Sequence, residues 1–175
     1  MPADALSAAL VRAESLIRSI PDYPQPGVLF RDITPLLADR EALHATTEAL
    51  VAPFLGSFDV VAGIEARGFI LAGAAAIAAG SGFVPIRKAG KLPIPAASVD
   101  YALEYGTATI EMHEDLPAGS RILLIDDVLA TGGTLAAGRA IVEQLGYTVA
   151  GISVLFEIEA LRGRAVVGAV HTVFR

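Results

Sequence analysis

The chain has 175 residues, a formal net charge of −6 and no cysteine, and hydrophobic residues make up 54% of it. This composition predicts a packed globular protein and excludes a disordered chain, a disulfide scaffold and thiolate chemistry. There is no basic block to follow a nucleic-acid backbone, so we expect no nucleic-acid partner. We expect a single soluble, cytoplasmic domain spanning residues 1–175.

The first third of the chain predicts helices on either side of a proline-rich connection. Residues 1–20 predict an amphipathic helix, because apolar residues recur three or four positions apart among charged ones. This pattern does not fit a secretory signal. Residues 21–37 begin with "PDYPQP" and predict a stiff, extended loop, because proline disfavours a helix. Residues 40–55 predict a second helix.

Strands and helices then alternate to the end of the chain. The predicted strands are 59–64, 82–89, 107–114, 121–125 and 148–158, with an edge strand within 165–175; the predicted helices are 66–79 and 134–145. Pro85 indicates an edge or a bulge in its strand, and residues 90–106 lack periodicity and predict a mobile loop. The Ala-rich run "FILAGAAAIAAGSGFV" is too short to cross a bilayer, so we expect no membrane partner. The alternation predicts an α/β fold whose central, mostly parallel β-sheet is flanked by helices.

The stretch "RILLIDDVLATGGT" carries the strongest indication of a site. Its apolar strand ends at Asp126 and Asp127, two adjacent like charges that cost stability unless a partner meets them. Ala130, Thr131, Gly132, Gly133 and Thr134 follow. Their backbone N–H groups and hydroxyls, placed before a helix N-terminus, favour a phosphate. The two carboxylates suit the 2′ and 3′ hydroxyls of a ribose, so the pattern indicates a ribose 5-phosphate site. A tight strand-to-helix turn with an Asp cap is the alternative.

In parallel sheets a ligand lies beyond the carboxyl ends of the strands. Segments 65–68, 87–91 and 126–134 should therefore converge at one site. A Walker A loop is not present, because "GK" at 90–91 lacks the required glycine and hydroxyl residue, and no dinucleotide fingerprint is present either.

The motif "LLIDDVLATGGT" resembles the signature of the type I phosphoribosyltransferase family, whose members bind 5-phosphoribosyl 1-pyrophosphate (PRPP). The segments "PDYPQPGVLFRDITPLL", "GIEARGF", "IRKAGKLP" and "YALEYG" resemble the branch of this family that acts on adenine. The resemblance covers about residues 15 to 165. It implies the type I phosphoribosyltransferase fold, with an N-terminal helix and base-recognition segment over about 1–35 and a flexible catalytic hood loop over about 90–110.

The resemblance also implies a place for the pyrophosphate of PRPP. Negative charge that develops on a leaving pyrophosphate must be met by cations. Arg67 is expected to contact it, and Arg87, Lys88 and Lys91 form a second cationic group, for which solubilising surface charge is the alternative. The expected cofactor is Mg²⁺, held mainly by substrate oxygens and water. The three histidines lack metal-ligand spacing, so we expect no metal site made by the protein itself.

Glu104 in "DYALEYG" is the expected catalytic acid–base residue, since attack by N9 of adenine requires the base to lose a proton. A loop that closes over the site would also exclude water from the reacting carbon. Tyr101 and Tyr105 would cover the site from the same loop, and Tyr105 would also reach the pyrophosphate. The alternative for Glu104 is an ordinary exposed turn.

The resemblance assigns adenine recognition to Leu29, Phe30, Arg31 and Ile158. Leu29 and Arg31 would offer main-chain groups to the adenine edge, Phe30 would stack on one face, and Ile158 would pack on the other. Ordinary core packing is the alternative for Phe30 and Ile158. The substrates implied are adenine and PRPP, the products AMP and pyrophosphate, and the assembly a homodimer. A transferase for a 6-oxo purine and a non-catalytic PRPP-binding regulator are the alternative functions.

Overall fold

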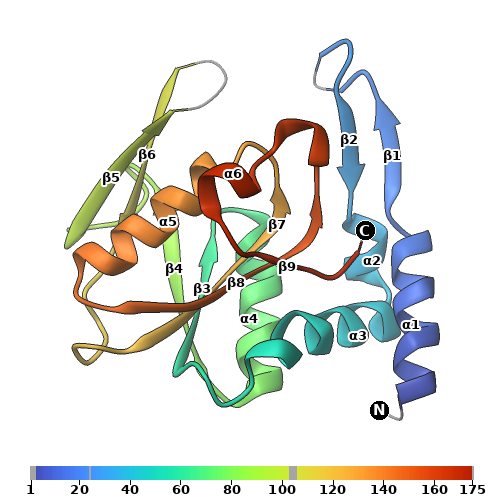
Figure 1. Cartoon of the computed structure of the whole chain (residues 1–175), viewed down its shortest axis with the longest axis horizontal. Helices are drawn as coiled ribbons and strands as arrows, with labels where there is room; N and C mark the ends of the chain where they lie inside the picture. Colours follow the sequence, from blue (N-terminus) through green and yellow to red (C-terminus); the bar gives the residue numbers. More distant parts are fainter. Residues whose placement is uncertain (1–2, 24, 103–105, 175) are drawn as a thin grey trace. The chain divides into compact units, whose positions relative to one another are not determined.

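The computed structural model describes residues 3–23, 25–102 and 106–174, and the chain divides into two compact units, residues 1–49 and 50–175 (Figure 1). The first unit contains α1 (Ala3–Ser15), β1 (Arg18–Pro21), β2 (Leu29–Asp32), α2 (Thr34–Ala38) and most of α3 (Arg40–Val51). The second contains η1 (Ala52–Phe54), β3 (Val60–Ile64), α4 (Arg67–Ala79), β4 (Gly82–Lys88), β5 (Ala97–Ala102), β6 (Thr107–Met112), β7 (Arg121–Leu129), α5 (Gly133–Gln144), β8 (Thr148–Glu157), η2 (Glu159–Leu161), α6 (Arg164–Val167) and β9 (His171–Thr172).

The first unit corrects two predictions. The helix predicted to reach residue 20 ends at Ser15, and β1 pairs antiparallel with β2 from Arg18↔Asp32 to Pro21↔Leu29. The predicted loop 21–37 holds β2 and the short helix α2. Pro21 is compatible with this hairpin because it occupies the end of its strand, where a missing N–H donor costs little.

The second unit is built on a seven-stranded sheet in the order β5-β6-β4-β3-β7-β8-β9. The five strands from β4 to β9 in this order pair in parallel, whereas β6 pairs antiparallel with both β4 and β5. The mostly parallel α/β sheet is therefore confirmed. β5 lies within the predicted mobile loop 90–106, which corrects that prediction for residues 97–102.

The helices α4 and α5 cover opposite faces of this sheet. A Cβ placed on Gly63 would lie 2.7 Å from Cβ of Ala72 in α4, whereas a Cβ on Gly138 in α5 would lie 3.0 Å from Ile64. Because Gly63 and Ile64 are neighbours in β3, their side-chain positions point to opposite faces. Burial on both faces explains why the apolar run from Ile122 to Ile125 in β7 does not alternate.

Two strand boundaries differ from the sequence prediction. β4 is an inner strand, so the predicted edge position of Pro85 is wrong. Its pairing with β6 is confined to Arg87 and Lys88, so Pro85 lies in the part of β4 that is bonded on one side. The loop predicted from residue 126 begins later, because β7 continues through both aspartates to Leu129. β9 is an edge strand, as predicted. No helix in the described part of the chain has the length and apolar character needed to span a bilayer.

Candidate active site

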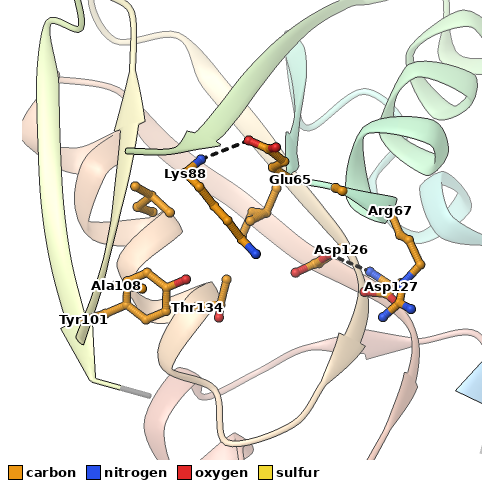
Figure 2. Close-up of a pocket in the computed structure, with 11 residues that line it drawn as sticks. Glu65, Arg67, Lys88, Tyr101, Ala108, Asp126, Asp127 and Thr134 are labelled. Carbon is orange, nitrogen blue, oxygen red and sulfur yellow. Dashed lines mark hydrogen bonds and ion pairs between the residues drawn. The ribbon is translucent and has the colours of Figure 1, made fainter. Parts of the chain in front are cut away.

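A cavity of about 460 Å³ lies at the carboxyl ends of β3, β4 and β7, where the start of α4, the start of α5 and the β5–β6 hairpin enclose it (Figure 2). It is lined by Ile64, Glu65, Ala66, Arg67, Lys88, Tyr101, Ala108, Ile110, Asp126, Asp127 and Thr134. The three segments that the sequence analysis expected at one site, 65–68, 87–91 and 126–134, all contribute to it. The antiparallel hairpin adds an aromatic and apolar wall.

Asp126 is buried at the base of this cavity. It pairs in register with Val154 of β8, and its residue is 9% exposed. Its Oδ1 accepts a hydrogen bond of 2.9 Å from the N–H of Asp127. A Cβ at Gly68 would lie 2.9 Å from the same oxygen, so the first turn of α4 rests against this carboxylate. Burial, and then the charge of Asp127, raises the pKa of Asp126 well above its ordinary value.

We expect Asp126→Asn to raise the free energy of unfolding by about 1–2 kcal/mol near pH 8. The buried negative charge of Asp126 destabilises the folded state, as is common for charged groups kept in functional sites. The amide keeps the oxygen that accepts the Asp127 N–H and removes the buried charge. The pKa of Asp126 is raised in the folded state, so the wild type gains stability as pH falls through the folded pKa toward the unfolded value near 3.8. The advantage of the variant should therefore shrink in denaturant titrations at progressively lower pH.

Asp127→Asn is the matched control, because the carboxylate of Asp127 is already paired with Arg67. We expect no gain in stability from it. An Asp126→Asn advantage that is absent, or that stays constant between pH 8 and pH 4.5, would contradict the stated cost of burying this charge.

Arg67 and Asp127 form an ion pair across the pocket. Arg67 Nε contacts Oδ2 of Asp127, whose side chain is 7% exposed against 38% for Arg67. Figure 2 shows the arginine extending from the start of α4 to the end of β7. A predicted pyrophosphate contact and a predicted ribose contact are therefore joined to each other in this structure.

Glu65, to which the sequence analysis gave no function, organises the second cationic group. Its side chain is 8% exposed and its Oε1 accepts a 2.6 Å hydrogen bond from Nζ of Lys91. Its Oε2 accepts the backbone N–H of Lys88 at 3.1 Å and lies 3.5 Å from Nε of Arg87. The Lys91 hydrogen bond, more than any other contact, lowers the pKa of Glu65.

This arrangement separates the three predicted cations. Lys88 lines the cavity, and Figure 2 shows its side chain directed into it. Arg87 and Lys91 do not line it: Arg87 Nη1 donates 3.0 Å to the carbonyl of Lys91, and both side chains converge on Glu65. The sequence offered one signal for Glu65, because an acidic residue directly between a buried strand and Arg67 is unusual. It could not show the three partners of Glu65, which come from another strand and loop.

The predicted phosphate loop joins β7 to α5. Gly132 has φ +86° and ψ −10°, the left-handed region that favours glycine, and it is the N-cap of α5. Thr134, in the first turn of α5, lines the cavity. Ala130 and Thr131 belong to the same connection, and Gly133 is the first residue of α5. The helix therefore begins where the cavity ends, and its N-terminal dipole favours an anion there.

The predicted residues Glu104, Tyr105, Tyr101 and Ile158 all belong to the second unit. Glu104 and Tyr105 lie outside the described residues, whereas Tyr101 of β5 lines the cavity. Ile158 follows β8 and is the N-cap of η2.

In the first unit, Leu29, Phe30 and Arg31 all lie in β2. Leu29 is 52% exposed, and the ring of Phe30 packs edge-on against Tyr23 with centroids 5.2 Å apart.

Within the described residues no group of three or more His, Cys, Asp or Glu side chains is placed to hold a metal ion. The carboxylates that the cavity offers are Glu65, Asp126 and Asp127. The first is engaged by Lys91 and the third by Arg67. This donor set fits a divalent ion that takes most of its ligands from a phosphate-bearing substrate and water.

Comparison with known proteins identifies the family of this fold and site. A family model described as a phosphoribosyl transferase domain matches residues 41–169. Adenine phosphoribosyltransferase of Arthrobacter sp. (strain FB24) is 59% identical over 152 residues, which cover 86% of this chain and 82% of the relative. The enzyme of that name from Thermobifida fusca is 58% identical over 150 residues, covering 85% of each chain.

Solved structures with a similar fold carry the same name. Adenine phosphoribosyltransferase from Rhodothermus marinus superposes with a TM-score of 0.89 at 47% identity, covering 96% of this chain and 98% of the other. The Saccharomyces cerevisiae enzyme, solved with an imino-altritol bisphosphate and adenine, gives a TM-score of 0.90 at 33% identity, with coverage of 96% and 99%.

Proposed function

Because this chain belongs to the phosphoribosyltransferase family, and within it to the adenine phosphoribosyltransferases, we propose that it transfers the 5-phosphoribosyl group of PRPP to N9 of adenine. The products are AMP and pyrophosphate. The observation that carries the proposal is one cavity that places the cations Arg67 and Lys88 beside the carboxylates Asp126 and Asp127, at the start of α5. Such a cavity offers separate groups to a pyrophosphate and to a sugar.

The ribose 5-phosphate half of PRPP fits the end of β7 and the loop that follows it. We propose that Asp126 and Asp127 accept hydrogen bonds from the 2′ and 3′ hydroxyls. The N–H groups and hydroxyls of residues 130–134 hold the 5-phosphate, aided by the dipole of α5. Asp127 would then exchange its contact with Arg67 for a sugar hydroxyl.

The pyrophosphate half fits the other side of the cavity. Arg67, released from Asp127, and Lys88 meet the negative charge that develops as the bond from C1 of the ribose to pyrophosphate breaks. Arg87 and Lys91 complete the cationic group around Glu65. Mg²⁺ is the proposed cofactor, held mainly by substrate oxygens and water, and it would supply further charge neutralisation on the pyrophosphate.

The new bond joins C1 to N9 of adenine, and the proton of N9 must leave. We propose that the Glu104 carboxylate takes this proton, and that Tyr105 contacts the pyrophosphate from the same loop. Tyr101, which lines the cavity from β5, supports a covering function for this hairpin. Excluding water at that stage prevents hydrolysis of the reactive sugar carbon.

Recognition of the base is proposed for main-chain groups of Leu29 and Arg31 and the ring of Phe30 on β2. Ile158, beside the phosphate loop, is proposed to pack on the base. A fixed main-chain acceptor can take a hydrogen bond from the 6-amino group of adenine. A 6-oxo purine offers no donor there and leaves this acceptor unpaired, so the site discriminates strongly against 6-oxo purines.

We also propose a cytoplasmic homodimer. Ile77 of α4 is 83% exposed and Ile70, two turns earlier, is 50% exposed, with Phe83 of β4 37% exposed. Apolar side chains gathered on neighbouring elements favour contact with another protein surface. Sedimentation of the wild type and of Ile77→Asp would test the assembly.

Steady-state turnover with PRPP and Mg²⁺, comparing adenine, hypoxanthine, guanine and xanthine, tests the function. We expect AMP from adenine and turnover lower by at least about 10⁴-fold with the 6-oxo purines, as for sites built to pair one polar pattern. Turnover with a 6-oxo purine instead would overturn the base assignment alone. PRPP binding without turnover on any base would favour a regulator over an enzyme.

A further inference from the structure

Residues 159–167, which comprise η2, α6 and the two residues between them, pack directly on the proposed phosphate loop. We call them the C-terminal turn. Figure 1 shows α6 beside α5 in the second unit. Two glycines, Gly132 in the loop and Gly163 in the turn, face each other where the two segments meet.

The loop side of this contact has no space for a side chain. A Cβ on Gly132 would lie 2.6 Å from the carbonyl oxygen of Gly163, 2.8 Å from Cγ2 of Val167 and 3.1 Å from Cβ of Val166. The left-handed φ of +86° independently favours glycine at this position. The backbone of the loop is therefore packed against the C-terminal turn at the residue that starts α5.

The turn side is equally close. A Cβ on Gly163 would collide with the carbonyl oxygen of Ala130 and lie 2.6 Å from Cδ1 of Leu129. Gly163 has φ −56° and ψ −29°, which any residue adopts. Only the close approach of the two backbones, and no backbone strain, requires glycine here.

Anchors on both sides keep the C-terminal turn in place. The N–H of Ile158 donates 2.9 Å to the carbonyl of Leu129. Arg164 donates through Nε to Glu157 Oε2 at 2.6 Å and through Nη1 to the carbonyl of Val170 at 2.7 Å. Val167 is 2% exposed. The turn is thus tied to the ends of β7 and β8 by contacts that lie outside the loop.

We propose that Gly163 and the C-terminal turn are positioning elements for the 5-phosphate, an inference that rests on the proposed function. Donors that bind an anion must be held within fractions of an ångström of their working geometry. The loop itself has two adjacent glycines, one of which, Gly132, is in the left-handed region, so its own sequence leaves it adaptable. Packing against Gly163 fixes the backbone of Ala130 and Gly132, which lie within the segment 130–134 proposed to supply the phosphate donors.

This assignment predicts a selective effect on ligands. Ligands that contain the ribose 5-phosphate, AMP and ribose 5-phosphate itself, depend on the loop. Pyrophosphate is assigned to Arg67 and Lys88, on α4 and β4, and does not. A general loss of structure would weaken all three ligands together.

The test is calorimetric titration of the full chain with AMP, ribose 5-phosphate and pyrophosphate in the wild type and Gly163→Ala. We expect about a tenfold loss of affinity for the first two in Gly163→Ala, and pyrophosphate affinity within about twofold of wild type. Equal losses for all three ligands, or no loss, would overturn the positioning assignment. A wild type that binds neither AMP nor ribose 5-phosphate would overturn the proposed function itself.

Gly151→Ala is the matched control. A Cβ there would lie 2.9 Å from Cζ of Phe54, so the same methyl group collides inside the same unit. Gly151 pairs with Leu123, toward the end of the sheet away from the cavity. We expect it to lower the melting temperature without selective loss of AMP.

Arg164→Gln is a second variant that introduces no collision and loosens the turn by removing the pair with Glu157. We expect the same selectivity with a smaller loss for AMP, about threefold. If Gly163→Ala does not fold, this variant decides the question: an unchanged AMP affinity, or an equal loss for pyrophosphate, overturns the proposal.

Discussion

Replacing Arg67 by glutamine is expected to lower kcat/KM for PRPP by about 10²–10³-fold, the size of effect seen when one preorganised donor to a developing negative charge is lost. Glutamine keeps a hydrogen-bonding amide at the level of the arginine Nε but has neither the two terminal nitrogens nor the positive charge. Arg67 lies at the start of α4 with its Nε on Asp127, already inside the cavity. The loss should appear in pyrophosphate affinity as well, measured by titration.

Arg67→Lys separates charge from geometry. Lysine retains the positive charge and lacks the planar fork that matches phosphate oxygens. We therefore expect an activity between those of wild type and Arg67→Gln.

Arg121→Gln is the matched control for a lost arginine–aspartate pair. Arg121 donates to Asp59 at 2.7 Å, at the amino end of β7, whereas the cavity lies at the carboxyl ends of the strands. We expect its pyrophosphate affinity and kcat/KM to stay within about twofold of wild type, as for surface pairs. Wild-type kcat/KM in Arg67→Gln would remove Arg67 from the pyrophosphate site.

The sequence predicts the second unit well because its elements are specified locally. The buried part of a strand such as 122–125 is an unbroken apolar run in the sequence, and the Ala-rich α4 ends at a left-handed glycine, Gly80. The place of the site follows from topology, since ligands bind beyond the carboxyl ends of parallel strands. The sequence places the end of β7 too early because charge is read as a loop signal, whereas the pairing of β7 with β8 carries Asp126 inside the sheet.

What the sequence does not predict depends on pairing between distant segments. β1 and β2 form a hairpin across a proline-rich connection, and β5 forms only because β6 pairs with it along its whole length. The part played by Glu65 was missed for a different reason: its carboxylate pairs with Lys91, which is 26 residues away in the sequence. Likewise, the approach of Gly163 to Ala130 is a matter of space between two backbones, for which sequence carries no periodic signal.

Glu104→Gln is expected to lower kcat by about 10²–10⁴-fold, the usual range for a lost general acid or base. The amide is nearly isosteric and cannot accept the N9 proton, so the affinities for PRPP and AMP should stay close to wild type. Rapid-mixing measurement of a single turnover separates this chemical step from product release. The acid limb of the pH–kcat profile, where the wild-type carboxylate becomes protonated, should disappear in the variant.

Glu111→Gln is the matched control because it removes a carboxylate from the adjoining strand β6. Glu111 accepts the N–H of Gly90 at 3.1 Å and is not among the residues that line the cavity. We expect its kcat and pH profile to match wild type. If Glu104→Gln keeps wild-type kcat, the N9 proton passes to water or to a substrate phosphate oxygen. The hood loop would then serve to exclude water, and catalysis would rest on the charges around pyrophosphate and the ribose contacts of Asp126 and Asp127.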